Sequence, residues 1–307
     1  TDDGGYILAG ETSSKDRDVT NIHGMLGYSD FWVVKLNIFY SIEWQKSLGG
    51  SGVEVANCVR QVKDKGFIVA GFTSSDDGDV TGFKGGNADF WVVKLDSAGS
   101  IEWEKTLGGS RFDIAYSIAE TSDNGYIVVG STTSEDGDVA GYHLMEDLWI
   151  VKLSPTGTIE WQKTMGGDGA DIAKSVCKTN DGGYIVAGSA TSINGDINEN
   201  KGRSDIWIIK FKPDNSIERQ RTLGGSNFEY ANSINQTKDG GYIISGTTDS
   251  FDGDVLGYRD SQDFWLVKLR ATGSVEWTRT AGGSFYDEGA DISQTKDGTY
   301  IALGNSL

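Results

Sequence analysis

The chain has 307 residues, a formal net charge of −18 at pH 7 and a pI of about 4.4. This acidity argues against nucleic-acid binding, which requires a basic surface, and no run of 18 apolar residues indicates insertion into a membrane. With 43 Gly, only 2 Pro, 9 Trp, 12 Tyr and 12 Phe, the composition favours a sheet protein with many tight turns. Cys58 and Cys177 occupy different places in a repeated pattern, so a disulfide framework is not expected.

One sequence pattern recurs through the whole chain, and its first tryptophan marks the period. This tryptophan returns in steps of 59, 58, 58 and 58 residues, at Trp32, Trp91, Trp149, Trp207 and Trp265. A fixed period of this length indicates a repeat architecture. We therefore expect a single domain over residues 1–307, with the repeat units 1–50 (partial), 51–109, 110–167, 168–225, 226–283 and 284–307 (partial).

Each repeat holds four short runs with strand character and none with helical periodicity. In the clearest copy these runs are, in chain order, residues 90–95, 101–107, 113–121 and 126–130. The links at 96–100 and 123–125 are short and contain glycine, which predicts hairpins, because glycine adopts a positive φ at little cost. A Gly-Gly pair precedes the third run, and a long acidic loop leads from the fourth run to the next repeat.

Four antiparallel strands in each repeat predict an all-β fold, a β-propeller of four-stranded antiparallel blades; a solenoid of sheets is the alternative. The run equivalent to 126–130 occurs six times, whereas each of the other three runs occurs five times. We expect five blades, with residues 287–295 completing the blade that contains Trp32. In a ring of six or more blades, the chain would instead be a fragment of a longer protein.

The repeated motifs resemble a known family. LGGS-x-x-D-x-A-x-S-I, DGGYIVAG-x-TSS, DFWVVKL and GSIEWQKTLGG are similar to the bacterial extracellular β-propeller repeats called SBBP repeats, above all to versions from secreted proteins of the Bacteroidetes type. The resemblance covers essentially the whole chain. It implies an extracellular or cell-surface location, with the natural signal segment absent from this chain, and it transfers no catalytic residue. The fourth copy departs from the pattern, with Arg219 in place of a tryptophan and NGDINEN (194–200) in place of the usual acidic loop.

The long acidic loops and the Gly-Gly turns emerge on the same face of such a fold. Aspartates of the Asp-Gly-Asp loops are candidate ligands for calcium, which takes six to eight oxygens. These candidates are Asp77, Asp79, Asp136, Asp138, Asp252 and Asp254. The alternative is that Asp and Gly are simply good turn residues, so that the cofactor is either calcium or none.

A second set of carboxylates begins the third run of each repeat. Its members are Glu54, Asp113, Asp171, Glu229 and Asp287. They could form an axial ring around a cation. Alternatively, each caps the N–H groups of the preceding Gly-Gly turn or pairs with a lysine of the set Lys35, Lys94, Lys152, Lys210 and Lys268, because a buried lysine needs a partner. The two histidines, His23 and His143, are expected to be solvated.

These features predict a non-enzymatic extracellular binding or scaffold propeller whose acidic loop face contacts a protein or a glycan at the cell surface. The first alternative is a multivalent lectin with shallow sugar sites near exposed aromatics such as Phe83, Tyr142 and Tyr258. The second is a surface polymer formed by strand addition at an unpaired edge. A glycosidase is not expected, because an acid and a base need unlike surroundings and these carboxylates repeat almost identically.

Overall fold

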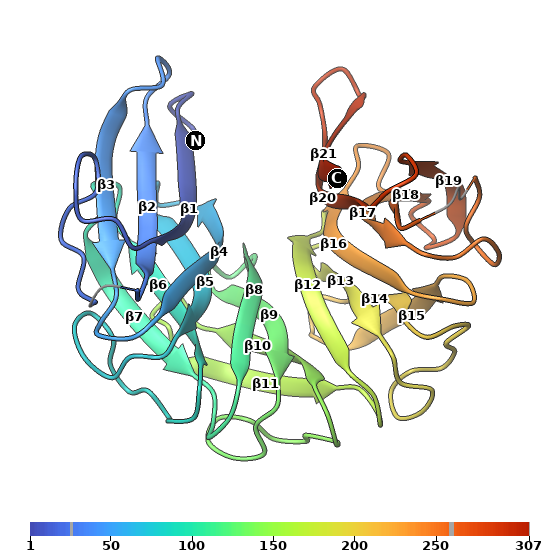
Figure 1. The fold of residues 1–307 in the computed structure, drawn as a ribbon, viewed down its shortest axis with the longest axis horizontal. Helices are drawn as coiled ribbons and strands as arrows, with labels where there is room; N and C mark the ends of the chain where they lie inside the picture. Colours follow the sequence, from blue (N-terminus) through green and yellow to red (C-terminus); the bar gives the residue numbers. More distant parts are fainter. Residues whose placement is uncertain (25–26, 258–260, 307) are drawn as a thin grey trace. The chain divides into compact units, whose positions relative to one another are not determined.

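A computed structural model of the chain describes residues 1–24, 27–257 and 261–306. Every regular element in these residues is a β-strand, so the predicted all-β fold is confirmed (Figure 1). In the described part there is no helix with the length and apolar character needed to cross a membrane. The chain divides into two compact units, residues 1–142 with 149–164 and residues 143–148 with 165–307.

The first unit contains three sheets, and in each of them the strands pair in chain order. The first sheet consists of β1 (Tyr6–Thr12), β2 (Asp30–Leu36) and β3 (Ile42–Leu48). The second consists of β4 (Glu54–Gln61), β5 (Phe67–Thr73), β6 (Asp89–Leu95) and β7 (Ile101–Leu107). The third consists of β8 (Asp113–Glu120), β9 (Tyr126–Thr132), β10 (Asp147–Leu153) and β11 (Ile159–Met165), of which residues 147, 148 and 165 belong to the second unit.

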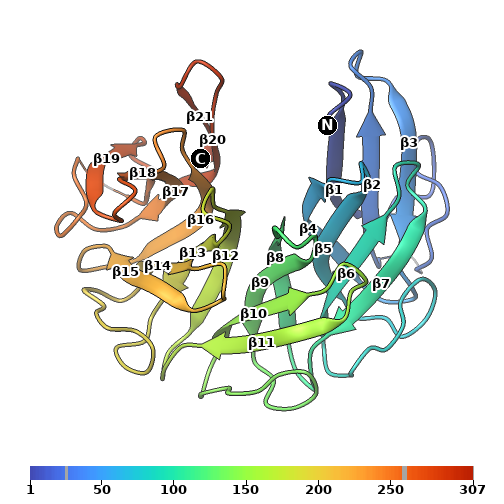
Figure 2. The same cartoon turned by 180° about the vertical axis from the view of Figure 1, so that it is seen from behind.

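The second unit also contains three sheets with strands paired in chain order, seen from behind in Figure 2. The first consists of β12 (Asp171–Lys178), β13 (Tyr184–Ala190), β14 (Asp205–Phe211) and β15 (Ile217–Leu223). The second consists of β16 (Glu229–Gln236), β17 (Tyr242–Thr248), β18 (Asp263–Leu269) and β19 (Val275–Ala281). The last consists of β20 (Asp287–Gln294) and β21 (Tyr300–Ser306). The repeated four-stranded antiparallel sheets are blades of a β-propeller fold.

The pairing that five blades would require is wrong. In place of completing the sheet that contains Trp32, β20 pairs with β21 from Asp287 opposite Ser306 to Gln294 opposite Tyr300. The sheet of β1 to β3 keeps three strands among the described residues. A hairpin partner a few residues away costs far less loop-closure entropy than a partner from the other end of the chain. The described residues thus form four complete four-stranded sheets, one sheet of three strands and one of two.

Strand β21 has β20 as its neighbour in this two-stranded sheet. Two of its apolar side chains are largely exposed, Ile301 at 58% and Leu303 at 63%. The equivalent side chains of the complete sheets are buried, as in β17, which has no exposed position. Self-association by strand addition at such an edge stays a prediction.

The core of each unit lies between neighbouring sheets. In the first unit the first tryptophan of one repeat packs there on an aromatic ring of the repeat before it, and in the second unit Trp265 clusters with Ile206. Trp91 lies 4.5 Å from Phe31, and Trp149 lies 4.6 Å from Phe90, measured between ring centroids. The second strand of each complete sheet carries a glycine at this level because there is no room for a side chain. A Cβ at Gly130 would collide with the carbonyl oxygen of Ile114 and come within 2.8 Å of the Phe90 ring. Trp91 and Trp149 thus fill the space between neighbouring sheets.

Candidate functional site

The carboxylates of the predicted calcium loops hold these loops onto the Gly-Gly turns. In the third copy, Asp136 Oδ1 accepts a 2.7 Å hydrogen bond from the N–H of Ser110, and Asp138 Oδ2 accepts a 3.3 Å bond from that of Gly108. Asp77, Asp79, Asp252 and Asp254 do the same in the second and fifth copies. In the fourth copy, Asn194 Oδ1 accepts the equivalent bond at 3.0 Å. Since an amide serves as well as a carboxylate, the first of these contacts does not require a charge.

In the part of the chain that the structure describes, no group of three or more His, Cys, Asp and Glu side chains is arranged to hold a metal ion. Two of the loop carboxylates face basic side chains instead. Lys201 Nζ lies 2.5 Å from Asp254 Oδ2, and Lys84 Nζ lies 3.8 Å from Asp138 Oδ2. Calcium binding by these loops stays a prediction.

The carboxylates that begin β4, β8, β12, β16 and β20 are buried and cap the Gly-Gly turns. Glu54, Asp113, Asp171, Glu229 and Asp287 each accept the N–H of the second glycine of the preceding pair at 2.7 to 3.0 Å. Burial raises the pKa of Asp113 and of Asp171, although their hydrogen bonds oppose the shift. The capping alternative is therefore confirmed, whereas a cation among these side chains stays a prediction.

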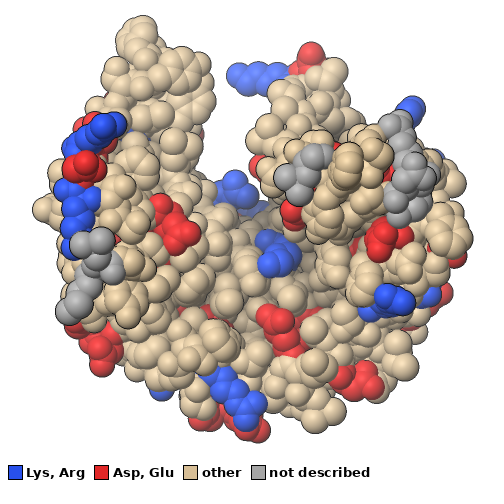
Figure 3. All heavy atoms as spheres, in the orientation of Figure 1, with Lys and Arg blue, Asp and Glu red and all other residues tan. Residues whose placement is uncertain are grey.

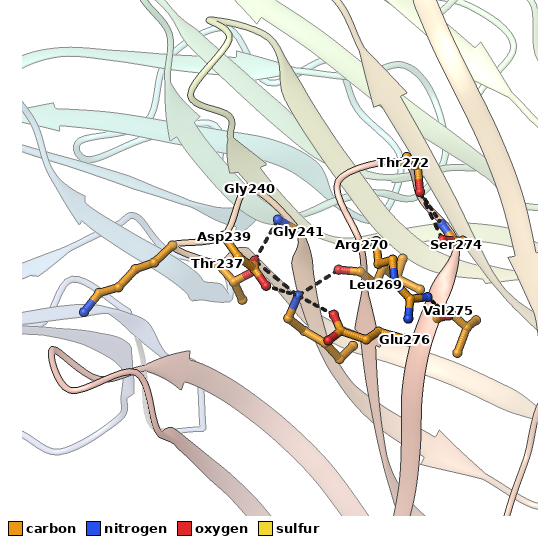
Figure 4. A network of polar contacts seen from close by, with 12 residues as sticks. Thr237, Asp239, Gly240, Gly241, Leu269, Arg270, Thr272, Ser274, Val275 and Glu276 are labelled. Atoms are coloured by element: carbon orange, nitrogen blue, oxygen red, sulfur yellow. Dashed lines mark hydrogen bonds and ion pairs between the residues drawn. The ribbon is translucent and has the colours of Figure 1, made fainter.

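The buried lysines do not pair with these carboxylates, which corrects the second alternative. Lys268 is 2% exposed, and its Nζ lies 2.9 Å from Asp239 Oδ2 and 3.3 Å from Glu276 Oε2. Figure 4 shows Asp239, in the hairpin turn between β16 and β17, and Glu276, on β19, converging on this ammonium group. Lys35, Lys94, Lys152 and Lys210 are held in the same way by a turn aspartate and a glutamate. Each lysine stands near the end of its strand, away from the Gly-Gly turns that the other carboxylates cap.

A third set of aspartates begins the strand with the first tryptophan and is also fully buried. Asp30, Asp89, Asp147 and Asp205 each accept a backbone N–H from the loop before them through Oδ2. Their Oδ1 atoms have no hydrogen-bond partner among the described residues. Burial, together with nearby carboxylates, raises the pKa of Asp89 to about 7 and that of Asp205 to about 6. Burial thus disfavours the charged forms of Asp89 and Asp205.

Both histidines are exposed, as expected, and each also contacts an aspartate of this third set. His23 Nδ1 lies 2.9 Å from Asp30 Oδ2, and its Nε2 lies 3.6 Å from Asp79 Oδ2. His143 Nδ1 lies 3.1 Å from Asp147 Oδ2. The sequence does not predict these histidine–aspartate contacts, because a single histidine in a loop belongs to no motif and only the structure shows which aspartate lies beside it.

The acidic surface is divided rather than continuous on the face in view. Figure 3 shows Asp and Glu side chains there in separate patches, with uncharged residues and some Lys and Arg between them. Many carboxylates are also engaged internally with the Gly-Gly turns. The predicted contact of an acidic loop face with a partner stays a prediction.

The second unit holds a cavity of about 520 Å³. It lies where β14, β15 and the loop before β14 face the sheet of β16 to β19, and its deep wall includes Trp207, Ile208 and Tyr242. Its polar wall includes Arg219 and Arg221 on β15, with Asn198, Glu199 and Lys201 on the loop. A volume of this size falls within the range of small-molecule sites.

The first cause of the cavity is the replacement of a tryptophan by Arg219. In the second copy the indole of Trp103 covers Gly157 of the next sheet and donates a 3.1 Å hydrogen bond to Pro155 O. Arg219 keeps this link, since its guanidinium donates to Ala271 O at 2.6 Å. A thin guanidinium does not fill the volume of an indole ring.

The second cause is Glu199, which stands where the other loops have a residue with positive φ. The equivalent residues are Asn21 (φ 62°), Gly82 (φ 74°), Gly141 (φ 89°) and Gly257 (φ 87°). Glu199 does not take this conformation, which a glutamate adopts only with strain. The loop therefore follows another path, and the amide of Asn200 fixes it by donating to Ala190 O at 3.1 Å and to Ser192 O at 3.2 Å.

The altered loop path also releases the hydroxyl of Thr222. In other copies the equivalent threonine ties β-strand and loop together: Thr106 donates to Thr81 O at 2.7 Å and Thr164 donates to Ala140 O at 2.9 Å. Thr222 lines the cavity and makes no such bond. Both departures of the fourth copy, Arg219 and residues 194–200, thus line one cavity. The sequence marks both departures, but only the structure shows that they meet.

The aromatic side chains predicted to mark shallow sugar sites lie elsewhere. Phe83 and Tyr142 are only partly exposed, and neither lines this cavity. Tyr258 lies outside the described residues. A repeated sugar site at these positions stays a prediction.

No family model matches the chain, and no curated protein matches it. Several solved structures are similar to it. A Bacteroides caccae protein of unknown function shares 11% identity at a TM-score of 0.47, over 84% of this chain and 78% of the other. A Synechocystis apocarotenoid oxygenase variant shares 13% at 0.46, over 89% of this chain and 61% of its own length. The Neurospora crassa Pan2 WD40 domain shares 9% at 0.37, over 90% and 82%.

One sequence expectation needs correction at this point. The chain was expected to be non-enzymatic, yet an apocarotenoid oxygenase is among the similar solved structures, so this architecture does not by itself exclude an enzyme. At 11 to 13% identity and TM-scores below 0.5, the similarity says nothing about a reaction, a substrate or a catalytic residue in this chain. Membership in the SBBP repeat family stays a resemblance.

Proposed function

We propose that the protein is a binding module and that its ligand site is the cavity in the second unit. The observation that carries the proposal is the convergence of the two departures of the fourth copy on this cavity. Random sequence changes at two unrelated positions would not be expected to line the same cavity. A rigid frame with one altered loop is also the usual arrangement of a binding site.

The test reverses both departures. Arg219→Trp with Glu199→Gly restores the indole and the glycine of the other copies, and we expect it to fill the cavity. The control is Arg111→Trp with Glu135→Gly, which makes the same two changes at an exposed ion pair of 2.7 Å outside the cavity. Both proteins should fold, as checked by circular dichroism and thermal unfolding.

Binding is measured by ligand-observed NMR with a mixed set of neutral sugars, sugar acids, amino acids and nucleotides. We expect at least one compound to bind the original chain and the control equally, and to bind the cavity-filled variant at least tenfold more weakly. If no compound binds, or if a compound binds the cavity-filled variant as tightly as the original chain, the proposal is wrong.

A second candidate is a protein contact at the loop tips of the second unit. Ile193 and Phe251 occupy equivalent places in two loops and are 74% and 72% exposed. Exposed apolar side chains that lie together mark protein-interaction surfaces, and these two stand on the loops of successive repeats. The predicted extracellular location would suit either function and stays a prediction.

A further inference from the structure

We infer that the cavity takes a neutral polyhydroxylated ligand, the mono- or disaccharide end of a glycan, at a single site. This inference rests on the function proposed above and names the class of ligand. It is argued from the charges, the hydrogen-bonding groups and the shape of the cavity walls.

The basic side chains of the cavity wall lie beside carboxylates, and Glu199 adds a carboxylate on the loop. The weakest of these contacts is that of Arg221, whose Nη2 lies 4.0 Å from Asp254 Oδ1. Lys201 is paired with Asp254 at 2.5 Å, and Arg219 is paired with Glu218 at 2.7 Å. The buried Lys210 is paired with Asp181 at 2.8 Å. An anionic ligand would compete with these carboxylates and lie near Glu199, and it would approach a chain with a net charge of −18. A cation would meet the basic members of the same pairs.

The wall offers groups that both donate and accept hydrogen bonds. The Thr222 hydroxyl lacks the carbonyl partner that its equivalents have in the second and third copies. Across the cavity, Thr272 and Ser274 present two further hydroxyls, 3.0 Å apart, on the turn between β18 and β19 (Figure 4). Asn198 adds an amide on the loop side. Sugar hydroxyls also donate and accept hydrogen bonds, so they match these hydroxyl and amide groups. An apolar molecule would leave the same groups without hydrogen-bond partners.

The deep wall is apolar, which suits the C–H faces of a sugar ring. Ile185, Ile208 and Leu269 line it together with the rings of Trp207 and Tyr242. Few polar groups around an apolar wall are the general form of small-molecule sites. Since tryptophan occupies the place of Arg219 in the first, second, third and fifth copies, the reasoning applies to the fourth copy alone. It therefore predicts one sugar site in place of one per blade.

The experiment titrates the original chain with neutral hexoses and N-acetylhexosamines, their disaccharides, the corresponding uronic acids and benzoate. Two variants test the wall. Thr222→Val removes only the hydroxyl and should weaken sugar binding about tenfold, whereas Thr222→Ser should restore it. The matched control, Thr106→Val, makes the same change in the second copy and should leave binding unchanged.

The outcomes separate the two proposals. A neutral sugar that depends on the Thr222 hydroxyl and is lost when Arg219→Trp and Glu199→Gly fill the cavity supports the inference. A uronic acid or benzoate that binds tighter than every neutral sugar, and is lost in the filled cavity, overturns the ligand class but leaves the binding function in place. A sugar that binds equally to Thr222→Val, or no binding of any sugar, also overturns the inference.

Discussion

The guanidinium of Arg219 donates a 2.6 Å hydrogen bond to the carbonyl oxygen of Ala271. An arginine thereby links the two complete sheets of the second unit at the place where the second copy uses the indole of Trp103. The link survives the substitution because both side chains end in an N–H donor. The packing does not, because only the indole fills the space, and a cavity is the result.

Exchanging the two side chains should change stability in opposite directions. Arg219→Trp fills the cavity and should raise the free energy of unfolding by about 1–2 kcal/mol, whereas Trp103→Arg should lower it by a similar amount. Urea unfolding of the two variants against the original chain gives both values. If both substitutions changed the free energy of unfolding in the same direction, the unfilled volume beside Arg219 would not be the cause of the change.

The second glycines of two Gly-Gly pairs should respond differently to the same substitution. A Cβ at Gly225 would lie 2.5 Å from Asp252 Oδ1 and 2.6 Å from Ser250 Cβ, whereas a Cβ at Gly283 meets nothing within 4 Å. Gly225→Ala should therefore cost about 2 kcal/mol or more, and Gly283→Ala should stay within about 0.5 kcal/mol. The midpoint of thermal unfolding measures both. Equal effects would mean that the loop with Ser250 and Asp252 shifts to make room for the added Cβ at little cost in stability.

The buried ammonium groups should matter far more than exposed ones. Lys268→Met keeps the stem of the side chain but leaves Asp239, Glu276 and the carbonyl of Leu269 without their donor. We expect a loss of about 2 kcal/mol in urea unfolding. Lys212→Met, at an exposed hairpin position, is the control and should change little. A loss as large in the control would attribute the effect to methionine itself.

Stability should fall as the pH rises from about 4 to 7. The pKa of Asp89 is raised by burial to about 7 in the folded chain and returns to its ordinary value near 3.8 on unfolding. Its contribution is thus fully present below pH 4 and is lost as the pH passes 7, which costs roughly 2–4 kcal/mol. Asp89→Asn should flatten this part of the profile of unfolding free energy against pH. Asp96→Asn, whose carboxyl is exposed and has a lowered pKa, should not.

Removal of calcium should leave the melting temperature unchanged. Asp136 Oδ1 and Asp138 Oδ2 already accept backbone N–H groups, so the turn contacts account for these aspartates without a cation. Thermal unfolding with calcium and then with excess chelator tests this, because a ligand bound only by the folded state raises its stability. A fall of several degrees on chelation, abolished by Asp136→Asn with Asp138→Asn, would restore the calcium hypothesis.

The sequence predicted the strands of a blade because each signal for them is local. Alternating apolar residues, Gly-containing hairpins and a tryptophan every 58 or 59 residues locate β6 to β9 within a residue or two. The capping of Gly109 by Asp113 is also local, because the two residues are four positions apart, and it was among the alternatives.

Contacts between distant residues were decided only by the tertiary structure. The partners of Lys268, 29 and 8 residues away, depend on which turn and which strand lie beside it. The pairing of β20 with β21 depends on the competition between a near and a remote partner. The sequence by itself determined the strands, the turns and the four-stranded unit, because these depend on near neighbours. Which carboxylate meets which base, and that Glu199 and Arg219 open one cavity, depends on packing between sheets, where burial and volume decide.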